Sequence, residues 1–383
     1  MVERRKTTLM RQFPSIRNVI YMDTARVGPT SRAVSEVIFE EYQKILTEGN
    51  WDVDPYSSLP DVRDTLGSYL GVTGDEIALM RCVSEGISTV AYGLDLKEGD
   101  EVVVSEEEHP SGMLVWLNMV ETLGIKIKRV SVSADPYLVM SSLEDALNER
   151  TRIVSMSHVT TDTGTILPAK DIVRLSHNRG VPVLFDGAQS VGQIPVNLRD
   201  IGCDFYAFTG HKWLMGSLGT GGLFVSRESL EPLKVSWTGS RAGEWNRYTD
   251  RADFHRTAQR FEFGGRHVPL FLGLSESVRC GMETGIDGIR SEVSLKTDQV
   301  RQVISSVPNA NLLSPNVSVS ASGIVAFSTA NQNGEDLVES MKRDFNIYAK
   351  QTFSFDGVRL SIAFFNDDAQ IAVLGNAITE LAS

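Results

Sequence analysis

Two short apolar runs, each followed by polar residues, constrain the fold of this chain more than any other feature. The first run ends at Asp186, and the second, about one β-α unit later, ends at Thr209 and leads to Lys212. Such runs are typical of strands buried on both faces of a parallel sheet. Ligands bind at the carboxyl ends of these strands, so we expect Asp186 and Lys212 at one edge of one sheet.

Strand-like and helical patterns alternate through the first two thirds of the chain. Expected strands cover residues 77–81, 101–105, 125–131, 152–158 and 181–185, and expected helices cover 83–94, 111–123, 142–148 and 170–178. This alternation predicts an α/β fold with a parallel sheet covered by helices on both faces.

The pattern changes after about Gly264. Helices are expected at 287–305, 335–343 and 367–381 and strands at 323–328 and 358–364, which together indicate a smaller α+β unit. With 383 residues, the chain exceeds what one core usually serves. We expect a large domain at 21–264, a small C-terminal domain at 265–383, and an N-terminal segment at 1–20 that packs with the small domain. Residues 240–260 show weak periodicity and are expected to form a loop near the site or a subunit contact.

Charge and cysteine usage exclude several classes of partner. The net charge of −12 argues against nucleic acid or an anionic membrane as the main partner. Cys82, Cys203 and Cys280 form no C-x-x-C pair, and this odd number indicates a reducing compartment. No apolar run resembles a signal peptide or a membrane span, and the histidines lack the spacing of metal ligands. We therefore predict a cytoplasmic protein without a metal site.

A lysine and an aspartate at one sheet edge are the groups that pyridoxal 5'-phosphate (PLP) requires. The Lys212 amine can form a Schiff base with the cofactor aldehyde, and Asp186 can hold a proton on the ring nitrogen. The ordinary alternatives are a solvated lysine and an aspartate that caps a turn. The pairing favours the cofactor roles.

The cofactor phosphate needs backbone N–H groups at a helix start and hydroxyl donors. Ser84, Glu85 and Gly86 form the expected turn between strand 77–81 and the following helix, and Thr209 and His211 are further candidates. Ser84 can also serve as a plain helix N-cap, which is compatible with a phosphate role.

Residues 183–225 resemble the signature of the class V aminotransferase family of PLP enzymes. Weaker matches follow in family order at residues 21–25, 108–109, 163–165, 260–262 and 358–361, so the likeness covers nearly the whole chain. It implies PLP fold type I, in which a mostly parallel seven-stranded sheet is joined to a smaller α+β C-terminal domain. It also implies a homodimer.

The resemblance implies roles for further residues around the cofactor. His109 would stack on the cofactor ring and assist acid–base steps; its alternatives are a solvated loop histidine or a metal ligand. Gln189 would donate to the cofactor phenolate oxygen. Thr161 stands where relatives often have asparagine, and Gly265 stands where many have a threonine that reaches the partner subunit's phosphate.

Two arginines are the candidate substrate ligands. By resemblance, Arg359 would grip the substrate α-carboxylate, as a planar guanidinium can; a surface salt bridge is the alternative. Arg26 lies where relatives often have a small residue, and it could select a second anionic group. Arg266, next to Gly265, could serve as an anion ligand in place of the threonine that many relatives have there.

We expect a PLP enzyme that acts on the α-carbon of an amino acid, with an amino acid or keto acid as the substrate. Transamination is the first expectation, and epimerisation (as in isopenicillin N epimerase) or β-elimination are the alternatives. A cysteine desulfurase is less favoured because residues 343–359 contain no cysteine, where desulfurases carry their nucleophile. A non-catalytic PLP-fold scaffold is one rival. A nicotinamide-dependent dehydrogenase on a parallel sheet is another, but no G-x-G-x-x-G motif follows the first strand.

Overall fold

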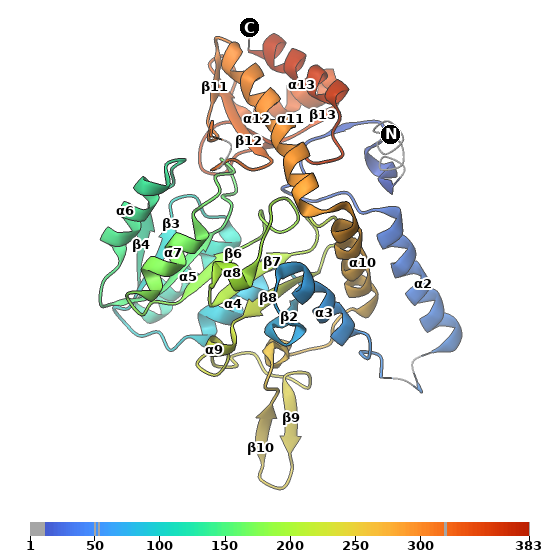
Figure 1. Ribbon diagram of the computed structural model, residues 1–383, viewed down its shortest axis with the longest axis vertical. Coiled ribbons are helices and arrows are strands. Elements are labelled where there is room, and N and C mark those ends of the chain that lie inside the picture. The colour runs from blue at the N-terminus through green and yellow to red at the C-terminus, as the bar shows by residue number, and fades with distance from the viewer. Residues whose placement is uncertain (1–11, 50, 53, 318–319, 383) are drawn as a thin grey trace.

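The computed structural model describes residues 12–49, 51–52, 54–317 and 320–382 (Figure 1). Its centre is a seven-stranded sheet in the order β2-β8-β7-β6-β5-β3-β4. The strands are β2 (Ile77–Met80), β3 (Glu101–Ser105), β4 (Lys126–Val130), β5 (Thr151–Ser157), β6 (Val183–Asp186), β7 (Phe205–Thr209) and β8 (Gly221–Val225). Since only β8 runs against its neighbours, the sheet is mostly parallel, and the predicted α/β fold is confirmed.

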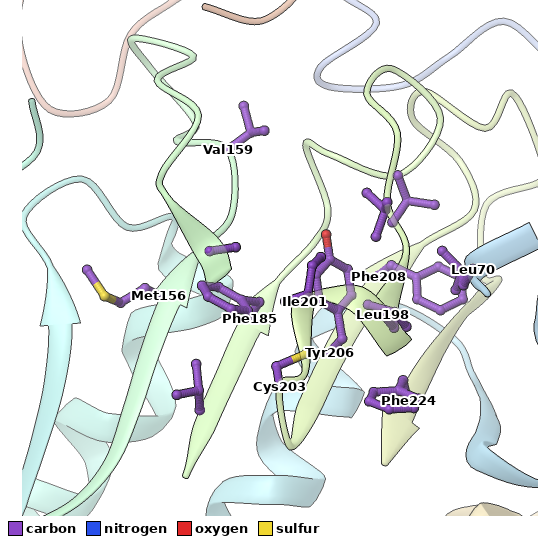
Figure 2. Packing of buried hydrophobic residues seen from close by; sticks show 14 of the residues in the cluster. Leu70, Met156, Val159, Phe185, Leu198, Ile201, Cys203, Tyr206, Phe208 and Phe224 are labelled. Carbon is purple, nitrogen blue, oxygen red and sulfur yellow. The ribbon is translucent and has the colours of Figure 1, made fainter. Parts of the chain in front are cut away.

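The central strands are apolar along their length because both faces of the sheet are covered. Successive side chains point to opposite faces. Phe185, Tyr206 and Phe208 enter the core on one face, which Figure 2 shows at close range. Leu184 and Phe205 enter the core on the other face.

Helices cover both faces of this sheet. They are α3 (Leu59–Leu70), α4 (Val83–Gly93), α5 (Pro110–Leu123), α6 (Pro136–Ala146), α7 (Ala169–His177), α8 (Leu198–Ile201), α9 (Arg227–Leu230) and α10 (Val268–Thr284). Helix α2 (Arg32–Glu48) packs on α10. Helices α4 and α5 pack on one face through Ile87 and Trp116. Helices α3, α6, α7 and α10 pack on the other. Short 3-10 helices lie at Pro14–Ile16, Gly74–Glu76 and Ala258–Phe261.

The C-terminal part is a smaller α+β unit with its own core. Its four-stranded antiparallel sheet has the order β11 (Ala310–Leu312), β12 (Ile324–Thr329), β15 (Val358–Ser361), β14 (Lys350–Gln351). Helices α11 (Ile286–Ser306), α12 (Gly334–Phe345) and α13 (Asp368–Leu381) cover it. Strand β1 (Ile20–Tyr21) pairs with β13 (Ile347–Tyr348).

The division of the chain into domains stays a prediction. Helix α10 packs in the large core through Phe271, Leu274 and Val278, which favours a boundary after this helix rather than at Gly264. In the N-terminal segment, Phe13 contacts Phe364 and Phe365 of the small unit; residues 1–11 lie outside the described part. No helix of the described part is long and apolar enough to cross a bilayer.

Three sequence expectations were wrong in detail. The helix expected at 142–148 is α6, which starts at Pro136 because the Asp135 side chain caps it through the Tyr137 N–H. The strand expected at 358–364 ends at Ser361. Residues 240–260 are no loop: they contain the hairpin of β9 (Gly243–Asn246) and β10 (Arg251–Phe254), which projects from the body (Figure 1). Neither face of the hairpin is buried, so its sequence lacks the alternation that marks a strand.

Candidate active site

A cavity of about 360 Å³ opens at the carboxyl ends of β6 and β7, next to the small unit. The residues that line it are Ala25, Arg26, Cys82, Val83, Ser84, His109, Ser111, Thr161, Gln189, Thr209, His211, Lys212, Lys350, Phe353 and Arg359. A deeper, narrower pocket adjoins it and adds Asp186 to five of the same residues. The two buried strands therefore deliver Asp186 and Lys212 to one place, as their positions in the sequence predicted.

Lys212 follows β7 by three residues in a tightly held turn. The neighbouring His211 carbonyl accepts a hydrogen bond from the Gly28 N–H, and the Lys212 carbonyl accepts one from Met215. Burial of the amine lowers the pKa of Lys212 to about 8, and the charge on Asp186 opposes this shift. A neutral, nucleophilic amine is thus accessible close to physiological pH.

Asp186 ends β6 and is only 6% exposed. One carboxylate oxygen, Oδ1, accepts a hydrogen bond of 2.8 Å from the Ala188 N–H. Burial raises the pKa of Asp186, while that hydrogen bond and the nearby Lys212 charge lower it. The other oxygen, Oδ2, lies beside the first turn of α5, where a Cβ built on Gly112 would be 3.6 Å away. Asp186 thus keeps an oxygen for a positively charged ring nitrogen.

His109 is the N-cap residue of α5. Its Nδ1 accepts a hydrogen bond of 3.0 Å from the Ser111 N–H, which leaves the proton on Nε2. Burial and the charges of Lys212 and Arg359 lower the pKa of His109 to about 4, so the ring is neutral at physiological pH. Its edge meets the ring of Phe353 at 5.4 Å between centroids. A neutral flat ring at this wall can stack on a bound aromatic group.

The first turn of α4 faces the cavity beside Thr209 and His211. Cys82 caps this helix without a side-chain hydrogen bond, so the N–H groups of the first turn stay open to a ligand. Thr209 Oγ1 lies 2.7 Å from His211 Nδ1. Burial and the Lys212 charge lower the pKa of His211 to about 4. A helix N-terminus with adjacent polar side chains is a suitable cradle for a phosphate.

Arg359 lies on β15 and reaches into the cavity from the small unit. Its Nη1 donates to the carbonyl and the hydroxyl of Thr161 at 3.1 and 3.3 Å, and its Nη2 lies 3.6 Å from Asp23. Its buried Nε has no hydrogen-bond partner among the described residues. The guanidinium therefore keeps a donor for a carboxylate. Arg26 lies at the rim, 3.8 Å from Asp23.

Gln189 lines the cavity, but both ends of its amide are in use. Its Nε2 donates to the Ala25 carbonyl at 3.0 Å, and its Oε1 accepts from Trp213 Nε1 at 2.8 Å. The second N–H of Nε2 remains for a phenolate oxygen, so the predicted contact is still open.

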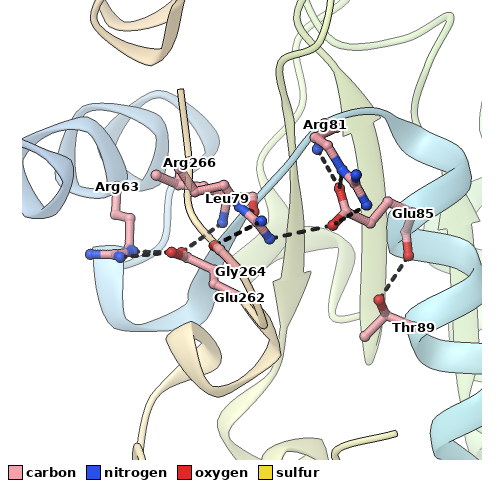
Figure 3. Close-up of polar contacts among 8 residues, drawn as sticks. All are labelled: Arg63, Leu79, Arg81, Glu85, Thr89, Glu262, Gly264 and Arg266. Atoms are coloured by element: carbon pink, nitrogen blue, oxygen red, sulfur yellow. Dashed lines mark hydrogen bonds and ion pairs between the residues drawn. The ribbon is translucent and has the colours of Figure 1, made fainter. Parts of the chain in front are cut away.

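Three predicted cofactor ligands are absent from the described lining of either pocket: Glu85, Gly86 and Gly265. Figure 3 shows why Glu85 is turned away: its carboxylate binds Arg81 and, at 3.4 Å, Arg266. Gly86 packs against β7, where a Cβ would lie 2.9 Å from Ala207 Cβ, and Gly265 adjoins the Tyr56 hydroxyl.

Arg266 is likewise no anion ligand within this chain. Its side chain is buried and donates to the carbonyls of Leu79 and Gly264 besides pairing with Glu85 (Figure 3).

Sequence reasoning missed six residues that line the main cavity: Ala25, Cys82, Val83, Ser111, Lys350 and Phe353. Cys82 and Ser111 directly adjoin predicted site residues, so helix-start geometry could have found them. Lys350 is the register partner of Arg359 on the adjacent strand. Phe353 follows in the connecting loop, whose N–H groups at Phe353 and Ser354 are held by the Asp162 carboxylate. No local sequence signal marks that contact.

The residues present fit the predicted cofactor. An amine for the aldehyde, a buried acid for the ring nitrogen and an open helix N-terminus for the phosphate line adjoining pockets. Among the described residues, no group of three or more His, Cys, Asp or Glu side chains could hold a metal ion.

Comparisons with known proteins identify the family of this chain. The family model "Aminotransferase class-V" matches residues 20–374. The chain is 29% identical to a probable cysteine desulfurase of Methanothermobacter thermautotrophicus, with coverage of 100% of this chain and 99% of the relative. It is 28% identical to isopenicillin N epimerase of Streptomyces clavuligerus, with 83% of each covered.

Among solved structures, the cystine C–S lyase C-DES in complex with its reaction product cysteine persulfide superposes with a TM-score of 0.89 at 24% identity. That likeness covers 96% of this chain and 99% of the other and supports fold type I. The chain therefore belongs to the class V aminotransferase family of PLP-dependent enzymes.

Proposed function

We propose that this PLP-dependent enzyme cleaves the carbon–sulfur bond of a cysteine-type amino acid by β-elimination. The observation that carries the proposal is the joint placement of Lys212, Asp186 and Arg359 around one cavity. The names of the relatives favour sulfur chemistry over the transamination that sequence reasoning put first.

Bound PLP supplies an electron sink that lowers the barrier to removing a proton from the substrate α-carbon. Arg359 binds the α-carboxylate and orients the substrate through its free donor. The Lys212 amine, neutral above about pH 8, takes the α-proton. Asp186 holds the proton at the pyridine nitrogen.

Loss of the sulfur substituent from the β-carbon then balances the removal of the α-proton. From cysteine and one water, the overall products are pyruvate, ammonia and hydrogen sulfide. From cystine, the sulfur product is cysteine persulfide.

The described thiols do not favour a desulfurase route. Cys203 is buried in the large core, and Cys280 lies in a separate cavity beside α10. Burial raises the pKa of Cys203 above its ordinary range and that of Cys280 to about 11, so neither is a ready nucleophile. Cys82 lines the active cavity and is the thiol to test.

Phe353 supports the same proposal. It occupies the loop before Arg359, where desulfurases carry their cysteine, and its ring lines the cavity. An aromatic wall suits a thioether or disulfide substituent and offers no sulfur acceptor.

Epimerisation is the second candidate, favoured by the likeness to isopenicillin N epimerase. Transamination and a non-catalytic PLP-fold scaffold rank below epimerisation. β-Elimination and these three alternatives all involve bound PLP, so only analysis of the products separates them.

The deciding experiment supplies the holoenzyme with L-cysteine, L-cystine and a panel of other L-amino acids. We expect pyruvate and released sulfur in equal amounts, and Cys82→Ser should retain this activity. Alanine as the carbon product, with sulfur transfer lost in Cys82→Ser, would instead support a desulfurase. Keto acid formation that requires a keto acid acceptor would support transamination, and scrambled stereochemistry without a keto product would support epimerisation.

A further inference from the structure

Glu108 is a half-buried residue whose carboxylate the proposed chemistry leaves without a role. It follows β3 and directly precedes His109, but its side chain turns inward. Its Oε1 accepts from the Ser157 N–H at 2.8 Å and from the Ser105 hydroxyl, and its Oε2 lies 2.7 Å from the Ser157 hydroxyl. The carboxylate thus makes its hydrogen bonds inside the protein, to two neighbouring strands, although part of the residue is exposed.

The first turn of α5 brings Glu108 next to Asp186. A Cβ built on Gly112 would lie 3.3 Å from Glu108 Oε2 and 3.6 Å from Asp186 Oδ2, so the two oxygens lie no farther apart than these two distances together. In addition, Ser157, which binds Glu108, is the register partner of Asp186 across β5 and β6. The Glu108 carboxylate therefore lies close to Asp186, the acid proposed to face the cofactor ring nitrogen.

We propose that Glu108 is a positioning residue whose ionisation sets how strongly Asp186 holds the positively charged ring nitrogen of PLP. This inference rests on the proposed role of Asp186. The ordinary role of Asp186 needs one negative charge, and an ionised Glu108 adds a second charge in a water-poor region where charges interact strongly.

The hydrogen bonds suit a group that changes its charge. Ser157 Oγ can donate to an ionised Glu108 and can accept from a protonated one, so both states stay satisfied. Burial raises the pKa of Glu108 to about 7; the Ser105 and Ser157 hydrogen bonds lower it, and the Asp186 charge raises it.

Asp186 is the main charged group that acts on Glu108. It approaches Glu108 from β6, whereas the contacts from β3 and β5 are the uncharged Ser105 and Ser157. His158, next along β5, is bound to Tyr206, and burial lowers its pKa to about 4, so it is neutral. His109 on α5 is also neutral at physiological pH.

The sign of the effect follows from linkage. A positive ring nitrogen lowers the pKa of Glu108 when PLP binds, because it favours the ionised carboxylate. The gain in PLP affinity that ionised Glu108 provides is therefore fully present above about pH 7. It is lost as the pH falls through the lower pKa of the bound state. Glu108→Gln keeps the shape and most hydrogen bonds but cannot ionise.

The test measures the PLP dissociation constant and the ¹⁵N shift of ring-labelled PLP in the holoenzyme between pH 5.5 and 8. At pH 8, we expect the wild type to bind PLP on the order of tenfold more tightly than Glu108→Gln. The reason is the attraction between the ring nitrogen and the ionised Glu108 carboxylate near Asp186, at an effective dielectric constant of about 20. The difference should vanish towards pH 5.5. Equal affinities at all pH values would overturn the proposal.

Glu107→Gln is the matched control. Glu107 is buried in the same loop, but its carboxylate is bound by the Asp162 N–H and by Thr163. This variant should keep the wild-type pH dependence. If it abolishes that dependence as well, the effect belongs to the loop and not to Glu108.

Two further variants keep the outcomes distinct. Ser157→Ala removes a hydroxyl that favours the ionised state of Glu108, so the pH step in PLP affinity should move to higher pH. An unmoved step would count against Glu108 even if Glu108→Gln does not fold.

Asp186→Asn tests the proposed role of Asp186 at the ring nitrogen. If Asp186→Asn leaves the ¹⁵N shift and affinity unchanged, the proposed function of Asp186 fails; if it acts while Glu108→Gln does not, only the Glu108 inference fails.

Discussion

At the scale of single residues, Arg359 shows how burial prepares a side chain for a ligand. Thr161 and Asp23 engage its two terminal nitrogens, and Nε is left without a partner among the described residues. Since an unmade hydrogen bond of a buried charged group is costly, a bound carboxylate would stabilise this arrangement.

Arg359→Gln should therefore weaken substrate binding. We expect KM to rise roughly 10- to 100-fold, which corresponds to the loss of about 1.5–3 kcal/mol for a charge-assisted hydrogen bond. Steady-state kinetics with the amino acid that the substrate panel identifies measure the effect. Arg343→Gln, which removes an exposed arginine paired with Asp344, is the control and should leave KM unchanged. An unchanged KM in Arg359→Gln would show that another group binds the carboxylate.

The Lys212 amine makes cofactor capture pH-dependent. Because burial lowers its pKa to about 8, the neutral fraction, and with it the rate of PLP capture by apoprotein, should rise with pH through about 8. The Asp186 charge raises that pKa, so the midpoint should fall in Asp186→Asn. Stopped-flow absorbance measures both. A wild-type midpoint near the ordinary lysine value would contradict this account of burial.

At the scale of elements, the distance between α4 and the sheet positions the helix start that is the predicted phosphate cradle. Gly86 has no side chain where α4 crosses β7, and an added Cβ would lie 2.9 Å from Ala207 Cβ. The helix start that faces the cavity can approach the sheet only because this position is glycine.

Gly86→Ala should push α4 outward. We expect a loss of about 1–3 kcal/mol in the free energy of unfolding, as for overpacked cores, together with weaker PLP binding. Urea denaturation and PLP titration measure these changes. Gly288→Ala on exposed α11, where a Cβ meets nothing within 4 Å, should be neutral or stabilising. If both variants behave alike, the close packing of Gly86 is not what positions the helix.

The sequence predicted those elements and residues whose signals are local. Asp186 and Lys212 were predicted because they lie at and just after the ends of two apolar strands, and Ser84 because it lies at a helix start. His109 was predicted from the family resemblance. Glu85 was placed at the phosphate because it adjoins Ser84, but ion pairs with Arg81 and Arg266 turn it away. The hairpin at 243–254 was not predicted because its strands are exposed on both faces, so the sequence lacks the alternation of apolar and polar residues that marks a strand.

At the scale of the whole molecule, the site is completed by the contact between the two units. Asp162 of the large unit accepts hydrogen bonds from the Phe353 and Ser354 N–H groups of the small unit at 3.0 and 2.7 Å. These residues are separated by about half the chain, so only the folded structure reveals the contact. The predicted homodimer and cytoplasmic location remain predictions.

Asp162→Ala should release the loop that carries Phe353. We expect KM to rise roughly tenfold or more, because hydrogen bonds to a carboxylate each contribute about 1.5–3 kcal/mol, while Lys212-dependent PLP binding persists. Kinetics and amide hydrogen exchange at residues 353–354 measure the change. Asp356→Ala is the control, since Asp356 binds the Gly334 N–H within the small unit. Unchanged exchange at residues 353–354 would exclude Asp162 as the anchor.

The most direct test of the whole account is borohydride reduction of the purified holoenzyme followed by peptide mapping. The account predicts one pyridoxyl adduct, on the peptide that contains Lys212, and its loss in Lys212→Ala. Lys350 is the other lysine that lines the cavity and so provides an internal comparison. An adduct on Lys350, or none on Lys212, would contradict the assignment of Lys212 as the residue that holds the cofactor.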